Sequence, residues 1–238
     1  MAAPRPNQRV SRILCASEPQ GASDALQRLG QLASDGDVQA IAIAGDLGIG
    51  EERSDSYRAL FRTLGETGLP AYWVPGPQDA PIADYLREAH NMELVFPSLR
   101  GVHGTAALTP DGHVLVGGIG GHVSDDPEAP REEMSALRYP RWEAEYRLKI
   151  LREFDELLTV LLFATPPAHR AHGDRGSDGI KELVGTYRPR LVVCGGERST
   201  ELIGRSVVVA PGRLAEGHYA IADLHTHDVQ MAEIGARV

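Results

Sequence analysis

Five short polar or glycine-rich segments each follow an apolar run of the chain, and they hold the side chains most able to do chemistry. In chain order they are Ser17-Glu18-Pro19-Gln20-Gly21, Gly45-Asp46-Leu47, Gly76-Pro77-Gln78-Asp79, Ala164-Thr165-Pro166-Pro167 and Gly195-Gly196-Glu197-Arg198. Carboxylates such as Glu18 and Asp46 supply oxygen ligands to hard cations. A guanidinium such as that of Arg198 binds carboxylates or other anions instead. The segments therefore point to a site for a cation, an anion or both.

These segments need a scaffold that brings them together, and the chain alternates apolar β-type runs with amphipathic helical stretches. We expect strands at residues 12–16, 38–44, 71–74, 93–96, 160–164 and 191–194. We expect helices at residues 23–34, 56–64, 82–90, 142–158 and 179–187. A turn at Thr109-Pro110-Asp111-Gly112 predicts a hairpin, and turn-linked strands follow from Ser206 onward. This order predicts an α/β fold of two packed mixed sheets with helices on both outer faces, whose strand ends carry loops on one edge.

Two segments in the middle of the chain carry further expectations. The helix over residues 142–158 places four apolar residues on one face, which predicts that this face packs in the core; they are Tyr146, Ile150, Phe154 and Leu157. Residues 117–134 are rich in Gly, then in acidic residues and Pro, which predicts an exposed loop. That loop could dock a partner through its acidic side chains, Asp125, Asp126 and Glu128.

Composition narrows the class of protein. A chain of 238 residues with 42% hydrophobic content fits one large domain, expected over residues 11–238 after a flexible lead-in at 1–10. The net charge of −9 argues against binding to nucleic acid or to an anionic membrane, and no apolar run is long enough to span a bilayer. Cys15 and Cys194 lie inside apolar runs, which predicts buried free thiols in a reduced, cytoplasmic setting.

The order of the five segments resembles that of calcineurin-like metallophosphoesterases. That family places D-x-H, G-D, G-N-H-[D/E], a lone His and G-H-x-H after successive strands. Gly45-Asp46 matches the second motif directly, and the other four segments stand at matching places in the chain. The resemblance implies a four-layer α/β/β/α sandwich. In the family these motifs hold two metal ions that activate water for attack on phosphorus.

Most of the family's metal ligands are replaced in this chain. Glu18 stands for Asp, Gln20 for His and Pro77 for Asn. Gln78 stands for the catalytic His, and the three later histidines are replaced by Ala164, Gly196 and Arg198. Only Asp46 is kept, and Glu18 is a conservative change. Imidazoles are the donors that such metals select, and a permanent cation repels a divalent ion. We therefore expect a degenerate site without two-metal hydrolase activity and without a cofactor.

Several alternatives remain open at this stage. A reduced, carboxylate-based site could hold a single Mg²⁺, Mn²⁺ or Ca²⁺ and support an active phosphoesterase; its ligands would be Glu18, Asp46, Asp79 and Glu197. In the metal-free interpretation, Arg198 pairs with Asp46 or Glu18, or binds a small anionic ligand together with Gln20 and Gln78. Asp46 could equally cap the turn after its strand. His169 and His172 could reach the same cleft, and the sequence leaves a homo-oligomer or a scaffold role undecided.

Overall fold

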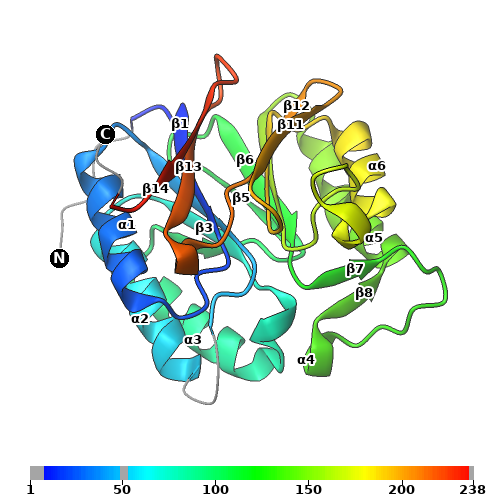
Figure 1. Cartoon of the computed structure of the whole chain (residues 1–238), viewed down its shortest axis with the longest axis horizontal. Helices are drawn as coiled ribbons and strands as arrows, with labels where there is room; N and C mark the ends of the chain where they lie inside the picture. The colour runs from blue at the N-terminus through cyan, green and yellow to red at the C-terminus, as the bar shows by residue number, and fades with distance from the viewer. Residues whose placement is uncertain (1–7, 49–52, 236–238) are drawn as a thin grey trace.

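Alternate residues of each central strand pack into different apolar layers, and this alternation explains the architecture. In β1 (Arg12–Ser17), Ile13 and Cys15 pack between the two large sheets, whereas Leu14 and Ala16 pack beneath helices. Because successive side chains of a strand point to opposite faces, a strand that is apolar on both faces must be covered on both sides. The result is a four-layer α/β/β/α arrangement (Figure 1) in the computed structural model, which describes residues 8–48 and 53–235.

Sheet A has the strand order β14-β13-β1-β2-β3-β4. Strands β1 to β4 run parallel, β13 is antiparallel to β1, and β14 is antiparallel to β13. The remaining strands are β2 (Ala40–Ala44), β3 (Ala71–Val74), β4 (Leu99–Gly101), β13 (His218–Asp223) and β14 (Val229–Glu233). The outer face carries α1 (Ser23–Asp35), α2 (Arg53–Glu66) and α3 (Ile82–Val95), with the 3-10 turns η1 (Pro77–Asp79) and η4 (Leu214–Glu216).

Sheet B has the order β11-β12-β10-β9-β6-β5, with its four inner strands parallel and its two edge strands antiparallel to their neighbours. The strands are β5 (Thr105–Leu108), β6 (Val114–Ile119), β9 (Leu158–Phe163), β10 (Leu191–Cys194), β11 (Ser199–Ile203) and β12 (Ser206–Ala210). Its outer face carries α5 (Arg141–Leu148), η2 (Lys149–Phe154), η3 (Gly173–Arg175) and α6 (Asp178–Tyr187). A small parallel sheet of β7 (His122–Ser124) and β8 (Arg138–Pro140) lies beside α4 (Glu133–Ala136).

The predicted fold class, two mixed sheets with helices on both outer faces, is confirmed. Cys15 and Cys194 are buried free cysteines, as expected. The strand predicted at residues 93–96 is wrong, because α3 continues to Val95. Leu94 is 84% exposed, so the apolar letters of this stretch do not mark a buried strand. No described helix is both long enough and apolar enough to cross a membrane.

The helix predicted over residues 142–158 is wrong in its length and in its buried face. α5 ends at Leu148, the tighter η2 follows to Phe154, and β9 begins at Leu158. Tyr146 is 72% exposed, whereas Ala144 and Leu148 are fully buried against sheet B. The smaller apolar residues therefore mark the core face, and the aromatic face looks outward.

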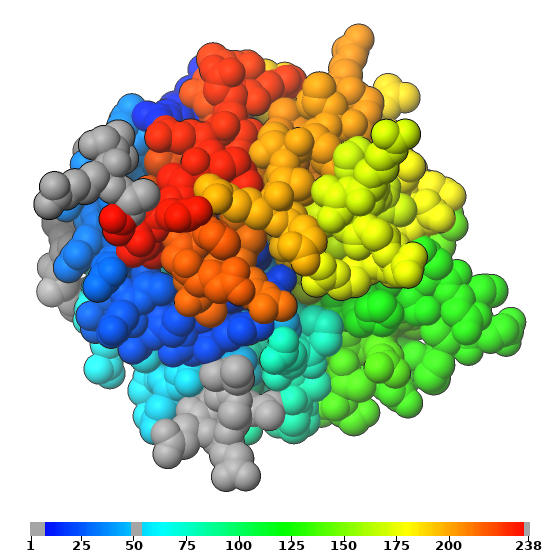
Figure 2. Space-filling view, in the orientation of Figure 1, coloured from blue at the N-terminus to red at the C-terminus, as the bar shows by residue number. Residues whose placement is uncertain are grey.

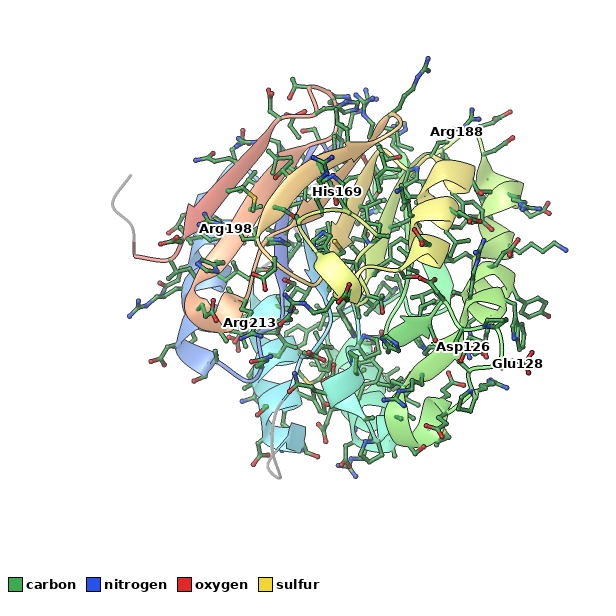
Figure 3. The ribbon with its side chains drawn as sticks, turned by 45° about the vertical axis from the view of Figure 1, so that its right-hand side comes forward. Asp126, Glu128, His169, Arg188, Arg198 and Arg213 are labelled. Atoms are coloured by element: carbon green, nitrogen blue, oxygen red, sulfur yellow. The ribbon has the colours of Figure 1, made fainter. Side chains whose placement is uncertain are left out.

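The loop predicted over residues 117–134 is wrong in its first half. The glycines at its start belong to β6, where a Cβ on Gly118 would lie 2.2 Å from the carbonyl oxygen of Leu162. Asp125 accepts hydrogen bonds from the Ser177 hydroxyl and from the amides of Asp178 and Gly179, so it holds the start of α6. The acidic residues Asp126 and Glu128 lie on the molecule's surface well apart from Arg198 and Arg213 (Figure 3).

The predicted lead-in over residues 1–10 falls mostly outside the described residues, because residues 1–7 are not among them. Val10 is 3% exposed, and its amide donates to the Asp111 carboxylate at 2.9 Å. The packed part of the chain therefore already includes the last residue of that segment.

Candidate functional site

The five polar segments meet at one edge of the molecule, where the carboxyl ends of β1, β2 and β3 face those of β9 and β10. A Cβ on Gly45 would lie 3.2 Å from the Ala164 Cβ, and one on Gly195 would lie 3.4 Å from the Glu18 Oε1. Segments from the beginning, middle and end of the chain adjoin one another near the centre of the face in Figure 2. We call these five segments together the loop junction. The predicted convergence of the strand-end loops is present in the structure.

Gln78, which stands at the position of the family's catalytic His, holds the Asp46 carboxylate in place at the junction. The Asp46 Oδ1 accepts the backbone amide of Gln78 at 2.9 Å, and its Oδ2 accepts the Gln78 side-chain Nε2 at 3.0 Å. Burial raises the pKa of Asp46 to about 6, and the neighbouring charges of Asp79 and Glu18 act in the same direction. The two Gln78 donors oppose this shift without cancelling it. Gln78 therefore fixes the Asp46 carboxylate through hydrogen bonds.

Asp79 has a structural role, and the expectation that it could bind a cation is wrong. Its Oδ2 accepts the amides of Leu47 at 2.9 Å and Gly76 at 2.7 Å. Its Oδ1 accepts the Gly48 amide at 2.9 Å and the Tyr57 hydroxyl at 2.8 Å. A carboxylate has about four lone-pair positions, so these four donors leave none for a metal ion. Asp79 thus joins the loop after β2 to the loop after β3.

Glu18 is paired with Arg213, a residue that the sequence did not single out. Glu18 Oε2 lies 3.2 Å from the Arg213 Nε, and Oε1 accepts the Gly196 amide at 3.1 Å. Arg213 comes from the loop after β12, and its side chain is 49% exposed. A sequence signal was present, since Arg213 directly follows the Pro211-Gly212 turn that ends an apolar strand. The Glu18 pair nevertheless joins residues 195 positions apart, beyond the reach of local patterns.

The expected pairing of Arg198 with Asp46 or Glu18 is wrong. The Arg198 Nη1 lies 2.8 Å from the Glu233 Oε1, and its Nη2 donates to the carbonyl oxygen of Ala232. Arg198 directly precedes β11, and its side chain reaches across to β14 of the other sheet. A cation does stand beside Glu18, but Arg213 supplies it.

Three site residues hold an unusual backbone conformation. Glu18, Gln20 and Asp46 have φ values of 48°, 46° and 46°, in the left-handed region that costs a residue with a Cβ about 1–2 kcal/mol. The Gln20 amide donates to the Asp46 carbonyl at 2.9 Å, which locks the first two segments together. The Gln20 side chain makes no hydrogen bond to any residue that the structure describes. The predicted role of Gln20 in anion binding stays a prediction.

Glu197, His169 and His172 are not gathered with Glu18 and Asp46. The Glu197 side chain is 64% exposed and pairs with Arg175. Both histidines contact the Glu201 carboxylate on β11 instead; the His172 Nε2 lies 3.4 Å from Glu201 Oε1. His172 is fully buried behind the junction, with its Nδ1 3.0 Å from the point where a Cβ on Gly196 would stand. The sequence did not indicate Glu201.

The donor set does not fit a two-metal centre. Within the described ranges 8–48 and 53–235, no three His, Cys, Asp or Glu side chains are placed to hold a metal ion. Glu18 and Asp46 are the two carboxylates left, and a guanidinium occupies one side of Glu18. Gly196 has φ 110°, a conformation that L side chains rarely adopt, so an imidazole could not be restored there without moving the loop. A single cation would have these two carboxylates as its side-chain ligands.

Comparison with known proteins agrees with this architecture. A family model described as metallophosphoesterase, calcineurin superfamily, matches residues 51–234. The crystal structure of TT1561 of Thermus thermophilus is 43% identical, with a TM-score of 0.88 over 95% of this chain and 100% of that one. A dimetal phosphatase from Danio rerio is 12% identical, with a TM-score of 0.63 over 95% and 96%. An archaeal phosphodiesterase is 9% identical, with a TM-score of 0.54 over 93% and 99%. Among curated proteins no match was found.

Proposed function

Because the chain belongs to the calcineurin superfamily of metallophosphoesterases, we propose that it is a member that has lost two-metal hydrolase activity and acts by binding a small anionic ligand at the loop junction. The ion pair between Arg213 and Glu18 is the observation that carries this proposal. At Glu18, where the family resemblance implies a carboxylate open to a metal, this chain presents the Arg213 guanidinium. A guanidinium can bind a phosphate or carboxylate with paired hydrogen bonds, as well as neutralise its partner.

The hydrogen bonds of Asp46 support the same proposal. Both of its carboxylate oxygens accept hydrogen bonds from Gln78, which stands where the family motif has its catalytic His. Asp46 therefore serves to order the junction in this proposal.

One observation favours a second candidate, a phosphoesterase that uses a single Mg²⁺, Mn²⁺ or Ca²⁺. Glu18 and Asp79 both raise the pKa of Asp46, so the carboxylates create a negative potential that a cation would relieve. In this candidate Glu18 and Asp46 would be the ligands, and the half-exposed Arg213 would swing away. Two proteins of similar fold are a dimetal phosphatase and an archaeal phosphodiesterase, so phosphomonoesters and phosphodiesters are the substrate classes to assay.

Metal analysis and hydrolysis assays separate the two candidates. We expect purified protein to hydrolyse neither p-nitrophenyl phosphate nor bis-p-nitrophenyl phosphate above background, with or without added Mn²⁺. Asp46→Asn and the unchanged protein should then release p-nitrophenol at the same background rate. Turnover that falls at least 100-fold in Asp46→Asn would overturn the proposal. Glu18→Gln serves as the second variant, since loss in both variants would assign the cation to this carboxylate pair.

A further inference from the structure

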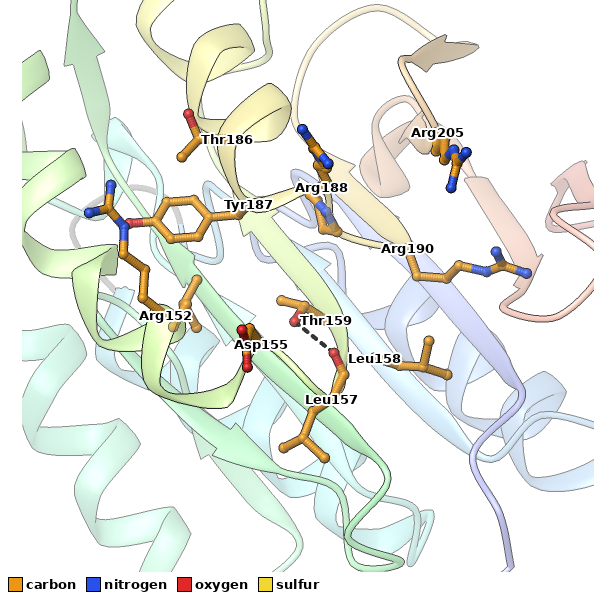
Figure 4. A pocket seen from close by; sticks show the side chains of 12 residues that line it. Arg152, Asp155, Leu157, Leu158, Thr159, Thr186, Tyr187, Arg188, Arg190 and Arg205 are labelled. Carbon is orange, nitrogen blue, oxygen red and sulfur yellow. Dashed lines mark hydrogen bonds between the residues drawn. The ribbon is translucent and has the colours of Figure 1, made fainter.

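A second, arginine-lined pocket lies at the opposite edge of sheet B from the loop junction. It has a volume of about 570 Å³ and opens where β9 and β10 begin (Figure 4). The junction lies at the carboxyl ends of the same strands, and a six-residue parallel strand such as β9 spans about 20 Å. A ligand in this pocket would therefore not touch Glu18, Asp46 or Arg213. The pocket is lined by Leu151, Arg152, Asp155, Leu157, Leu158, Thr159, Thr186, Tyr187, Arg188, Pro189, Arg190 and Arg205.

The pocket concentrates positive charge on an acidic protein. Four arginines and one aspartate line it, although the whole chain carries a net charge of −9. The arginines come from four places in the fold: η2, the end of α6, the residue before β10 and the turn between β11 and β12. None of the four forms an ion pair with a carboxylate among the residues that the structure describes. A bound anion would offset the repulsion between these guanidinium groups.

Structural roles account for two of the arginines. Arg190 donates through its Nη2 to the carbonyl oxygen of His225 at 2.6 Å and through its Nε to that of Leu224. It thereby ties the turn between β13 and β14 to sheet B. Arg152 lies alongside Tyr187 at one end of the pocket (Figure 4).

Arg188 and Arg205 have no such role. Both are exposed, and neither side chain makes a hydrogen bond to a described residue. Arg188 ends α6 with φ 48°, a position where glycine is the favoured residue. Retaining a long cationic side chain there costs about 1–2 kcal/mol of backbone strain. An arginine here places positive charge at the carboxyl end of α6, which the helix dipole favours, and in the lining of the pocket.

The remaining lining residues restrict the kind of anion. Leu151, Leu157, Leu158 and Pro189 give the pocket an apolar wall, and the Tyr187 ring adds a flat aromatic surface. A volume of about 570 Å³ lies within the range of roughly 300–1,000 Å³ found for small-molecule sites. Inorganic phosphate alone would leave the apolar wall in contact with water. We propose that this pocket binds a small organic phosphate of nucleotide size, with its flat body against Tyr187 and the leucines and its phosphates between Arg188 and Arg205.

Calorimetric titration of the full chain with three probes tests this assignment. Adenosine 5′-diphosphate has both the flat body and the charge, whereas pyrophosphate and adenosine each have one of them. We expect the diphosphate to bind most tightly, and its affinity to fall as NaCl is raised. The double variant Arg188→Gly and Arg205→Gln should weaken its binding at least tenfold. Glycine suits the left-handed backbone at position 188, so this variant should fold as well as the unchanged chain.

Two control variants make the outcome decisive. Arg62→Gln removes one positive charge from an exposed site on α2, on the far side of sheet A, and should leave binding within twofold. Arg213→Gln removes the guanidinium proposed to bind an anion at the loop junction, so any heat of binding that it removes belongs to the junction, and the binding that remains should be the part that the double variant weakens. The assignment is overturned if the double variant binds as tightly as the unchanged chain, or if Arg62→Gln weakens binding equally. It is also overturned if Arg213→Gln abolishes binding, or if none of the three probes binds at millimolar concentration.

Discussion

The two halves of the loop junction differ in the side chains that they present. The loops after β1, β2 and β3 of sheet A present Glu18, Asp46 and Asp79. The loops after β9 and β10 of sheet B present Ala164, Gly196 and Arg198 at the positions where the family resemblance places histidines. Each of the sheet A carboxylates accepts at least one backbone amide of a neighbouring loop, from Gly196, Gln78 and Leu47 respectively. The carboxylates of the sheet A half therefore join the loops of the junction to one another.

Packing has closed the sheet B half of the junction. The Ala164 Cβ would lie 3.2 Å from a Cβ on Gly45, so the methyl group fills the space between the two sheets' loops. Gly195 lies in the neighbouring loop, after β10, and a Cβ there would lie 2.6 Å from the Ala164 carbonyl oxygen. This close approach needs glycine. The sheet B half of the junction is thus closely packed, whereas the carboxylates of the sheet A half form a hydrogen-bonded hub.

The largest effect expected from this comparison is on the hub residue Asp79. Asp79→Ala would leave the amides of Leu47, Gly48 and Gly76 and the Tyr57 hydroxyl without their acceptor. Each unsatisfied buried donor costs about 1–3 kcal/mol, and with partial rehydration we expect a loss of about 3–5 kcal/mol in the free energy of unfolding. Urea denaturation followed by circular dichroism measures it.

The matched control for Asp79→Ala is Glu197→Ala in the sheet B half. Glu197 is 64% exposed and pairs with Arg175, so its loss should change the free energy of unfolding by less than about 1 kcal/mol. If Asp79→Ala and Glu197→Ala lowered the free energy of unfolding equally, the sheet A loops would not be the hydrogen-bonded half of the junction.

A smaller effect is expected from the titration of Asp46. The pKa of Asp46 is raised from its ordinary value of 3.8 to about 6, so the folded state holds the proton more tightly than the unfolded state. The resulting stabilisation is fully present below about pH 4 and is lost as pH rises through 6. The difference amounts to at most about 3 kcal/mol, at 1.36 kcal/mol for each pKa unit.

Asp46→Asn removes this titration. The Gln78 side-chain amide can turn round to accept from the new amide, so the variant should fold. Urea midpoints measured from pH 4 to pH 7 should fall less steeply in Asp46→Asn than in the unchanged chain. Parallel pH profiles would mean that Asp46 ionises in the folded state as it does in water.

The sequence predicted the scaffold better than the contacts within it. Alternation of apolar residues in strands such as β1 specifies two covered faces, and this is a local property of the chain. Asp46 and Gln78 were located because their segments directly follow apolar strands. The Arg213–Glu18 pair was missed, because it forms only where the segment after β12 passes beside the loop after β1, and no local pattern in the sequence specifies that path. Tyr146 was misplaced in the core for a similar reason: Ala144 and Leu148 offer a second apolar face, and only packing against sheet B selects it.

The smallest effect on stability, and the sharpest distinction, should come from the two arginines of the junction. Arg198→Met removes one partly exposed ion pair, with Glu233, and Arg213→Met removes two, with Glu18 and Glu216. Because exposed pairs contribute little, each variant should lower the free energy of unfolding by about 1 kcal/mol or less. Their effects on cation binding should differ. Arg213→Met leaves Glu18 unpaired near Asp46, and two such carboxylates attract a divalent ion; we expect Mn²⁺, followed by electron paramagnetic resonance, to bind about tenfold more tightly. Arg198→Met leaves Glu18 paired, so Mn²⁺ affinity should not change. If both variants bind Mn²⁺ as weakly as the unchanged chain, the guanidinium is not what keeps cations out, and the lack of histidines at positions 164, 196 and 198 alone would account for the weak binding.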